Sequence, residues 1–373
     1  MEQTIFTEEN ISLLTEELNR IQPKNILVVT GSSSYKTSGA DALIDRLFVK
    51  YNLIFFNDFS VNPKIEELEN GIRFCSKTNI DFIIAIGGGS VIDTAKLIRC
   101  YMNCGSSVAE LIKSNKIISD PKIPFLAIPT TAGSGSESTH FAVIYIDGTK
   151  YSVSHDSIRP DYALLYPSLT YNAPCYLTAC SGADALSQAI ESYWSVQSTE
   201  ESREYAKEAI FLLWQYLPNA VKNDTEAKNK VITASNLAGR AINISFTTAA
   251  HAYSYALTSN LGIPHGHAVS LTLPYFFNLN LNVSTANCND SRGVQFVKDI
   301  MNSLSGFIGG GSENASGMLS EFFLMIFGNT HNEAIAKITD AEKQKLTKNV
   351  NLQRLQNNPV RVTRQEIENI RYS

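Results

Sequence analysis

Apolar runs and amphipathic stretches alternate along the first half of the chain. Each run is rich in β-branched or aromatic residues and bounded by polar or glycine positions, as is typical of buried parallel strands. The four runs are NILVVTG (25–31), NLIFFND (52–58), DFIIAIGGGS (81–90) and PFLAIPTTAGSGSE (124–137). A stretch with helical spacing follows each of the first three, as in ADALIDRLFVKY and VIDTAKLIRCYM. This alternation predicts an α/β domain with a doubly wound parallel sheet.

Long helical patterns with few breakers begin at about Tyr176, and they include SREYAKEAIFLLWQYLPNAV and KVITASNLAGRAINISF. The preceding YPSLTYNAP supplies the proline and polar residues of a boundary. We therefore predict an α/β dinucleotide-binding domain over residues 1–175 and an all-helical domain over 176–373. GGGSENASG (309–317) has no strand before it and is predicted to be an interhelical loop.

Composition narrows the class of protein. The 373 residues exceed the size at which one hydrophobic core keeps growing. Hydrophobic residues make up 44% and charged residues 18%, which is ordinary for a globular enzyme. The net charge of −5 and the scattered basic residues argue against a nucleic-acid partner. No signal-peptide pattern or membrane-spanning run is evident, and the six cysteines lack zinc-type pairing, so we expect a cytoplasmic protein.

Two loops of small residues are candidates for holding a dinucleotide. Gly87, Gly88, Gly89 and Ser90 lie between a predicted strand and helix, where a diphosphate can approach the backbone and the helix N-terminus. The spacing is not GxGxxG, and a tight turn without a ligand is the alternative. The next strand ends in a second such loop with hydroxyls at Thr130, Thr131, Ser134 and Ser136. Two consecutive loops of this kind favour a dinucleotide site.

The remaining cofactor candidates are less specific. Asp93 and Lys96 lie one turn into the helix, where they either contact the cofactor or form a surface pair. After the first predicted strand come Gly31, Ser32 and Ser33, with nothing acidic to repel a 2′-phosphate. This favours NADP(H) over NAD(H), and a serine-rich surface turn is the alternative.

Four positions suggest a metal site. Asp184 and Gln188 are four residues apart on a predicted helix and share a face. His251 lies on a later helical stretch, and His265 follows a proline and is predicted to open another helix. Histidine is the commonest metal ligand, although any one of these histidines alone is better explained by a structural role.

Several motifs together resemble the iron-dependent (group III) alcohol dehydrogenase family. They are GGGSVIDTAK, IPTTAGSGSE, SGADALSQAIES and IPHGHAVSLTLP, and they occur in the family's order along nearly the whole chain. The resemblance implies a nicotinamide dinucleotide on the α/β domain and a divalent metal, Fe²⁺ favoured and Zn²⁺ as alternative, on the helical domain. By motif position the family's metal ligands fall on Asp184, Gln188, His251 and His265, and a lysine near the cofactor ribose falls on Lys150.

Two positions depart from the family's pattern. Gln188 occupies the place of the family's first histidine ligand, and an amide oxygen is a neutral, weaker ligand than an imidazole. Tyr255 stands where the family often has a further histidine, so we consider Tyr255 and His267 as the catalytic groups of the proton relay.

Within the family, DALSQAIESYWSVQSTEESREYA and AGRAINISFTTAAHAYSY look most like the phosphonoacetaldehyde reductase (2-hydroxyethylphosphonate dehydrogenase) branch. This implies reduction of a phosphonate-bearing aldehyde to a primary alcohol by a homodimer. Candidate phosphonate-binding groups are Arg159, Arg240, Ser245, Thr247 and Thr248. A short-chain alcohol or polyol dehydrogenase is one alternative, and a metal-dependent lyase of the dehydroquinate synthase type, or a degenerate nucleotide-binding protein, is another.

Overall fold

The computed structural model describes residues 3–102, 104–116, 123–348 and 352–373. The chain divides into two compact units, Met1–Ala173 and Pro174–Ser373. The predicted boundary after residue 175 therefore lies two residues from the observed one.

The first unit is built on a six-stranded sheet in the order β1-β8-β5-β4-β2-β3, in which every neighbouring pair is parallel. All four predicted strands are present in it. The strands are β1 (Thr4–Thr7), β2 (Asn25–Thr30), β3 (Asn52–Phe56), β4 (Phe82–Gly87), β5 (Phe125–Pro129) and β8 (Tyr162–Leu165).

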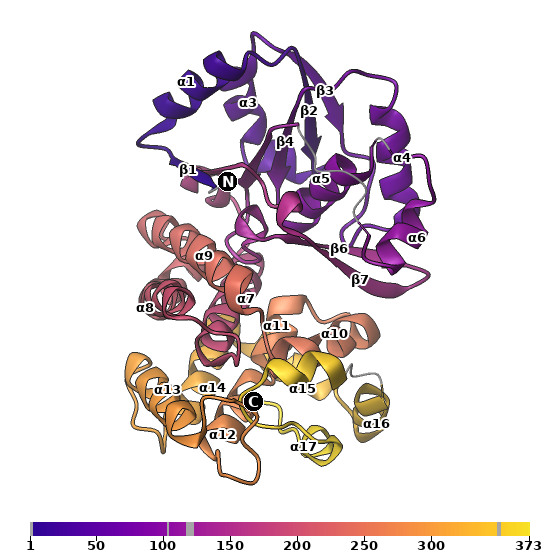
Figure 1. Ribbon diagram of the computed structural model, residues 1–373. Helices are drawn as coiled ribbons and strands as arrows, with labels where there is room; N and C mark the ends of the chain where they lie inside the picture. The colour runs from indigo at the N-terminus through magenta and orange to yellow at the C-terminus, as the bar shows by residue number, and fades with distance from the viewer. Residues whose placement is uncertain (1–2, 103, 117–122, 349–351) are drawn as a thin grey trace. The chain divides into compact units, whose positions relative to one another are not determined.

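Helices cover both faces of this sheet, and Figure 1 shows α1 and α3 on one side and α4 and α5 on the other. The helices of this unit are α1 (Ile11–Ile21), α2 (Ser34–Thr37), α3 (Ala40–Phe48), α4 (Ile65–Cys75), α5 (Gly89–Tyr101) and α6 (Val108–Lys113).

Alternating side chains of the central strands divide between the two faces, because successive residues of a strand point in opposite directions. Val28 and Ile84 join the core under α1 and α3, whereas Val29 and Ile83 join the core under α4 and α5. Both faces are buried, which explains the continuous apolar runs of the sequence and confirms the doubly wound α/β fold.

Some elements of the first unit were not predicted. The edge strand β1 is only four residues long, and β8 pairs with it and with β5. An antiparallel hairpin of β6 (Phe141–Ile146) and β7 (Thr149–Ser154) packs against α5 and α6. The short 3₁₀ helices are η1 (Ser136–Ser138), η2 (Asp156–Ile158) and η3 (Pro167–Thr170).

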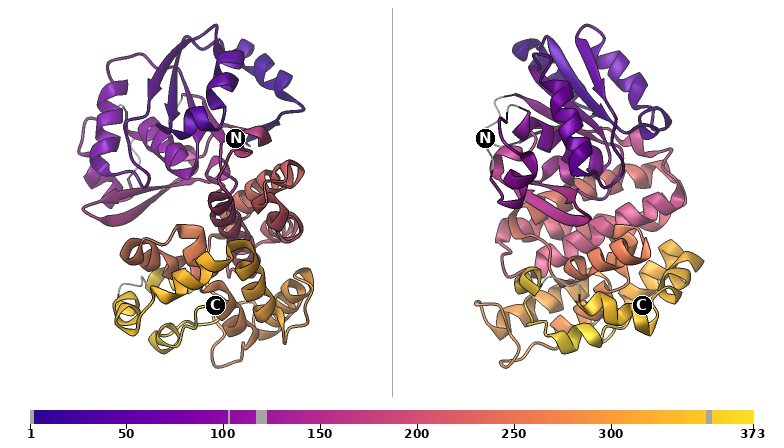
Figure 2. Two further views of the ribbon diagram at one scale, coloured as in Figure 1. Left: turned by 180° about the vertical axis from the view of Figure 1, so that it is seen from behind. Right: turned by 90° about the vertical axis from the view of Figure 1, so that its right-hand side faces the viewer.

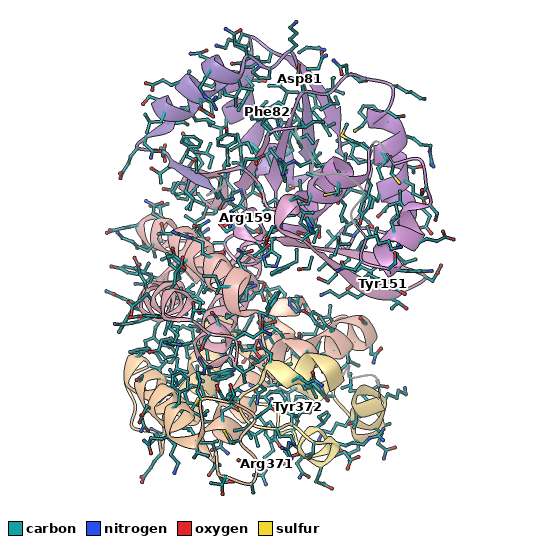
Figure 3. The ribbon with its side chains drawn as sticks, in the orientation of Figure 1. Asp81, Phe82, Tyr151, Arg159, Arg371 and Tyr372 are labelled. Atoms are coloured by element: carbon teal, nitrogen blue, oxygen red, sulfur yellow. The ribbon has the colours of Figure 1, made fainter. Side chains whose placement is uncertain are left out.

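The amino end of the sheet is tied together by Asp81, which is labelled in Figure 3. Its carboxylate accepts hydrogen bonds from the backbone N–H groups of Lys24 and Asn25, each at 3.0 Å. The contacts of Asp81 therefore stabilise the amino end of the sheet. The loops of small residues lie at the opposite end, where the strands have their carboxyl ends.

The second unit is helical throughout its described residues, as predicted, and Figure 2 shows it from two further sides. Its helices are α7 (Cys175–Trp194), α8 (Glu200–Val221), α9 (Thr225–Ser245), α10 (Ala249–Leu261), α11 (His265–Ser270), α12 (Leu273–Leu281), α13 (Val294–Phe307), α14 (Ala315–Phe327), α15 (Asn329–Ala336), α16 (Asp340–Lys348), η4 (Leu352–Asn357) and α17 (Arg364–Glu368). Most of the predicted loop 309–317 lies between α13 and α14.

Helix α7 lies at the centre of this unit and packs against α8, α9, α11, α13 and α14. From Thr178 to Trp194 every residue except Ser181 is buried. A helix buried on all sides is expected to be apolar, yet α7 carries Asp184, Gln188 and Glu191 in its interior part. Buried carboxylates are retained only where they are paired or bind a metal, so α7 is where a site is expected.

No helix within the described part of the chain combines the length and apolar character needed to cross a bilayer. The six cysteines are free thiols.

Candidate metal centre and cofactor loops

Three loops meet at the carboxyl edge of the sheet in the first unit. They follow β2, β4 and β5, which are adjacent in the strand order β5-β4-β2. After β2 the chain continues to β3 on one side, and after β4 it continues to β5 and β8 on the other. The order thus reverses between β2 and β4, and open α/β sheets bind their ligands at such a point.

Glycines bring the β4 and β5 loops into contact. A Cβ atom added to Gly88 would lie 3.3 Å from the Thr131 hydroxyl, and one added to Gly89 would lie 2.8 Å from the Ser134 hydroxyl. Gly88 is the N-cap of α5, so the start of this helix lies beside the Thr131 and Ser134 hydroxyls. Backbone donors, a helix N-terminus and partly exposed hydroxyls fit the diphosphate of a dinucleotide.

Asp93, Lys96 and Ser136 form a hydrogen-bond network inside the first unit. The Lys96 ammonium is fully buried and donates to the hydroxyls of Ser136 and Thr139, each at 3.0 Å, and to the carbonyl of Phe141 at 2.8 Å. The Ser136 hydroxyl donates to Asp93 at 2.5 Å. Asp93 and Lys96 do form an i,i+3 pair, with 3.9 Å between Lys96 Nζ and Asp93 Oδ1, but Lys96 is buried and not on the surface.

The same contacts change the interpretation of two predicted cofactor residues. Asp93 also accepts from the backbone N–H of Val143 at 2.9 Å, so both its oxygens face the protein. Ser136 is 4% exposed. Both residues hold the β5 loop against α5 and β6, and this places Thr131 and Ser134 beside the glycines.

Burial shifts the pKa values of Lys96 and Asp93 in this network. Burial lowers the pKa of Lys96 to about 8, although Asp93 and Glu137 act in the opposite direction. Burial also raises the pKa of the Asp93 carboxyl, against the effects of Lys96, its hydrogen bonds and the charge of Lys150. Lys150 pairs across the hairpin with Tyr145 and lies close enough to influence Asp93.

The loop after β2 is more exposed than the other two. Thr30 is followed by Gly31, and Ser32, Ser33 and Lys36 all lie on the surface. A Cβ at Gly31 would lie 2.2 Å from the Ser34 hydroxyl and 3.8 Å from Val91 of α5, so this loop folds back beside α5. Thr130 is buried, and its N–H donates to the carbonyl of Gly87 at 3.0 Å.

The second unit brings Asp184, His251 and His265 together from α7, α10 and α11. One donor atom from each lies within 4.8 Å of the others. The Asp184 Oδ1 atom is 3.2 Å from His251 Nε2 and 3.7 Å from His265 Nε2. Donors that share one divalent ion at about 2.1 Å each lie no more than about 4 Å apart, so these distances fit a metal site.

Both imidazoles are held so that Nε2 faces Asp184. The Nδ1 atom of His251 contacts the carboxylate of Glu191, and the Nδ1 atom of His265 is 3.3 Å from the Ser254 hydroxyl. Metal-binding histidines in proteins are usually oriented in this way by a partner of the second ring nitrogen. A carboxylate oxygen with two imidazole nitrogens is a donor set that suits Fe²⁺ or Zn²⁺.

Charge also favours a cation here. Burial opposes the charged form of His251, but the carboxylates of Glu191 and Asp184 outweigh it and raise the pKa of His251 to about 9. A bound metal ion would therefore compete with a proton for this imidazole.

Gly266 allows α11 to approach α7 closely. A Cβ atom at this position would lie 1.9 Å from the carbonyl oxygen of Cys180 and 2.9 Å from the backbone nitrogen of Asp184. Only glycine fits, and the close approach sets His265 beside Asp184. Gln188 lies one turn further along α7, on the same side as Asp184, and is 5% exposed.

Sequence reasoning missed Glu191, although its position contains a signal. Asp184, Gln188 and Glu191 are spaced i, i+4 and i+7, so they follow one face of α7.

The two candidates for proton transfer have different surroundings. The ring of Tyr255 stacks on that of the proposed ligand His265, with centroids 5.3 Å apart and an angle of 3° between the planes. His267 lies outside the cluster and is fully buried. Its Nδ1 atom is 3.0 Å from the Tyr176 hydroxyl and its Nε2 atom 3.2 Å from His331. Burial, with His331 and a lysine nearby, lowers the pKa of His267 to about 3.

Each of the two units matches a known protein family. Residues 2–167 match the family described as iron-containing alcohol dehydrogenase, and residues 178–372 match the C-terminal part of the Fe-containing alcohol dehydrogenase family.

Individual relatives extend this result. Long-chain-alcohol dehydrogenase 1 of Geobacillus thermodenitrificans is 33% identical over 70% of this chain and 68% of its own length. Phosphonoacetaldehyde reductase of Streptomyces viridochromogenes is 32% identical over 77% of this chain and 74% of its own. The structure of sulfoacetaldehyde reductase from Bifidobacterium kashiwanohense in complex with NAD⁺ superimposes with a TM-score of 0.86 at 28% identity, covering 98% of this chain and 95% of the other.

The fold, the loops of small residues and the carboxylate–histidine cluster thus define a metal-dependent, dinucleotide-linked oxidoreductase. The chain belongs to the iron-containing alcohol dehydrogenase family, and it is an NAD(P)-linked enzyme of that type.

The cofactor loops can be tested at Gly88. Its backbone angles, φ −77° and ψ −176°, are open to other residues, so Gly88→Val should fold. The added side chain would fill the space beside Thr131 and should weaken NAD(P)H binding on the order of tenfold or more. Quenching of protein fluorescence on titration with NADH and NADPH measures this. Gly306→Ala is the control, because nothing lies within 4 Å of a Cβ at Gly306; equal affinity in the two variants would contradict the loop assignment.

The metal cluster can be tested at its histidines. His251→Ala and His265→Ala should each weaken divalent-metal binding by more than about 100-fold and abolish turnover, since each removes a proposed ligand. Elemental analysis after dialysis measures the bound metal. His155→Ala, at an exposed position of the first unit, should retain it. Full metal content in both cluster variants would exclude this site.

Gln188 can be tested by introducing the histidine that the resemblance implies at this position. Gln188→His should increase the affinity for Fe²⁺ or Zn²⁺ by about tenfold, because imidazole is a stronger ligand than an amide oxygen. Competition with a chelating dye gives the dissociation constants. Unchanged affinity would place the side chain of residue 188 outside the coordination sphere.

Proposed function

We propose that this enzyme reduces a two-carbon aldehyde that carries a tetrahedral anionic group, with phosphonoacetaldehyde as substrate and 2-hydroxyethylphosphonate as product. The main support is the similarity to two relatives over most of the chain, one named phosphonoacetaldehyde reductase and one sulfoacetaldehyde reductase. Phosphonate and sulfonate are both tetrahedral oxyanions attached to carbon, so the two named substrates share their shape and negative charge.

The proposed reaction moves a hydride from the dihydronicotinamide to the carbonyl carbon and a proton to the carbonyl oxygen. A divalent metal, with Fe²⁺ favoured, supplies Lewis acidity for that oxygen when it is bound. Asp184, His251 and His265 are the residues that would hold it, and the loops at Gly87–Ser90 and Thr130–Ser134 would hold the dinucleotide. Tyr255 is our assignment for proton transfer, because its ring lies on that of the proposed ligand His265.

His267 is left with a supporting role in this proposal. Its two ring nitrogens already face Tyr176 and His331, and its depressed pKa keeps the ring neutral near pH 7.

The candidate phosphonate-binding groups differ in availability. The Ser245 hydroxyl is 2.7 Å from that of Ser192, and Thr248 donates to Glu191 at 2.7 Å, so both are engaged inside the helical unit. Arg240 lies over the ring of Tyr205, 4.0 Å from its centroid. Arg159, labelled in Figure 3, lies in the turn before β8. Its side chain is partly buried. Of the hydroxyls, Thr247, which lies just before the N-cap residue of α10, remains the best candidate, because it is partly exposed.

A general alcohol dehydrogenase is the second candidate function. The similarity to a long-chain-alcohol dehydrogenase favours it, at an identity close to that of the phosphonoacetaldehyde reductase. The lyase considered from the sequence has no comparable support, because both halves of the chain match alcohol dehydrogenases.

An anaerobic assay distinguishes these functions. Purified protein with Fe²⁺ is mixed with NADPH or NADH and an aldehyde, and loss of absorbance is followed. We expect kcat/KM for phosphonoacetaldehyde to exceed that for acetaldehyde on the order of 100-fold or more, and NADPH to be preferred. Sulfoacetaldehyde and a long-chain aldehyde complete the series. Equal rates with phosphonoacetaldehyde and acetaldehyde would exclude recognition of the anion, and the highest rate with the long-chain aldehyde would support the second function.

The proposal also includes a homodimer and a cytoplasmic location. Light scattering on the purified protein tests the oligomeric state, and fractionation of the source cells tests the location.

A further inference from the structure

Glu191 is a fully buried carboxylate on the core helix α7, with no exposed surface. Its desolvation has a large free-energy cost, which only strong partners offset. Among the residues that the structure describes, the hydrogen-bond partners of its carboxylate lie at the start of α10.

One oxygen of Glu191 satisfies the N-terminus of α10. Glu191 Oε1 accepts from the backbone N–H of Ala250 at 2.8 Å and of His251 at 3.4 Å. It also accepts from the Thr248 hydroxyl at 2.7 Å. Thr248 is the N-cap residue of α10, but its side chain makes no capping hydrogen bond of its own. Glu191 therefore does from another helix what an N-cap side chain usually does.

The other oxygen of Glu191 contacts Nδ1 of His251. This contact places a hydrogen on Nδ1, so Nε2, which faces Asp184, is the ring nitrogen that would bind a metal ion in place of its own proton. One carboxylate thus fixes both the backbone on which His251 stands and the rotation and tautomer of its ring.

Glu191 is itself held in place by a further hydrogen bond. The indole N–H of Trp194 donates to the Thr248 hydroxyl at 2.8 Å, and Trp194 is 1% exposed. The hydroxyl accepts from Trp194 and donates to Glu191, so its direction is fixed. Trp194, Thr248, Glu191 and His251 form one continuous chain.

We propose that Glu191 is the positioning residue of the metal centre and that Thr248 and Trp194 hold it in register. Through His251 it sets the orientation and the basicity of a metal ligand. This inference rests on the metal site of the proposed function.

A capping role alone does not account for a carboxylate here. A neutral hydroxyl or amide caps a helix as well, without the cost of burying a charge. The direct contact with the His251 imidazole explains the negative charge, because a carboxylate that accepts a hydrogen bond from an imidazole makes that ring a stronger ligand for a cation.

Glu191→Gln tests this role, since the amide retains the size and the acceptor oxygen but loses the charge. Co²⁺ is the probe, and chelator competition gives its dissociation constant. We expect Glu191→Gln to weaken Co²⁺ binding about 10- to 100-fold and to shift the visible absorption bands of the bound Co²⁺. Thr248→Val, which removes one link and leaves the carboxylate in place, is expected to have a smaller effect in the same direction.

The control is Asp290→Asn, which removes a buried carboxylate from the same unit. Asp290 pairs with Arg292 at 2.7 Å and contacts none of the proposed ligands. It should lower the melting temperature without changing Co²⁺ affinity or spectrum. If Glu191→Gln fails to fold, the Co²⁺ affinity of Thr248→Val tests the proposal instead.

The outcomes separate this inference from the proposed function. Wild-type protein that binds Co²⁺, with Glu191→Gln and Thr248→Val binding within twofold of it, overturns the role of Glu191 and leaves the metal site intact. Wild-type protein that binds no Co²⁺ overturns the metal site, and the role of Glu191 with it.

Discussion

The imidazole of His251 lies between two carboxylates of a single helix, Asp184 and Glu191, and the organisation of the helical unit depends on this interaction. Both carboxylates are buried, and α7 is packed on all sides. An isolated charge in such a place would destabilise the fold by several kcal/mol. The imidazole and the N-terminus of α10 compensate for these charges, and a cation at the proposed site would add to them. The same contacts therefore stabilise the core of this unit and shape the candidate site.

The first unit also contains a buried charge that polar partners compensate. There the buried charge is the Lys96 ammonium, surrounded by hydroxyls, a carbonyl and the Asp93 carboxylate. These groups face inward and fix the loop after β5, so that the hydroxyls of Thr131 and Ser134 meet the glycines after β4. In both units, buried polar contacts position the residues that face a ligand.

The sequence allowed prediction of much of this because its strongest signals are local. Continuous apolar runs such as residues 81–87 identify strands buried on both faces, and the loops of small residues identify the functional edge of the sheet. The short strands β1 and β8 were not predicted. They have four residues each, and their position depends on pairing between distant segments. The i, i+4 spacing of Asp184 and Gln188 indicated the metal face of α7, and extending it by three residues would have included Glu191. The inward direction of Asp93 and Lys96 was not predictable, because the partners of Lys96 are forty or more residues away in sequence.

Joining a metal site to the core helix couples two equilibria. An ion that binds only the folded chain stabilises it by an amount that grows with the logarithm of free ion concentration over the dissociation constant. Because α7 contributes both Asp184 and the central packing surface of the helical unit, loss of a metal ion from the proposed site would remove a counter-charge from the middle of that core. If the proposed site binds its metal in this way, the heat resistance of the protein would rise with metal supply, and a cell short of that metal would hold less of the folded enzyme as well as less of the active one.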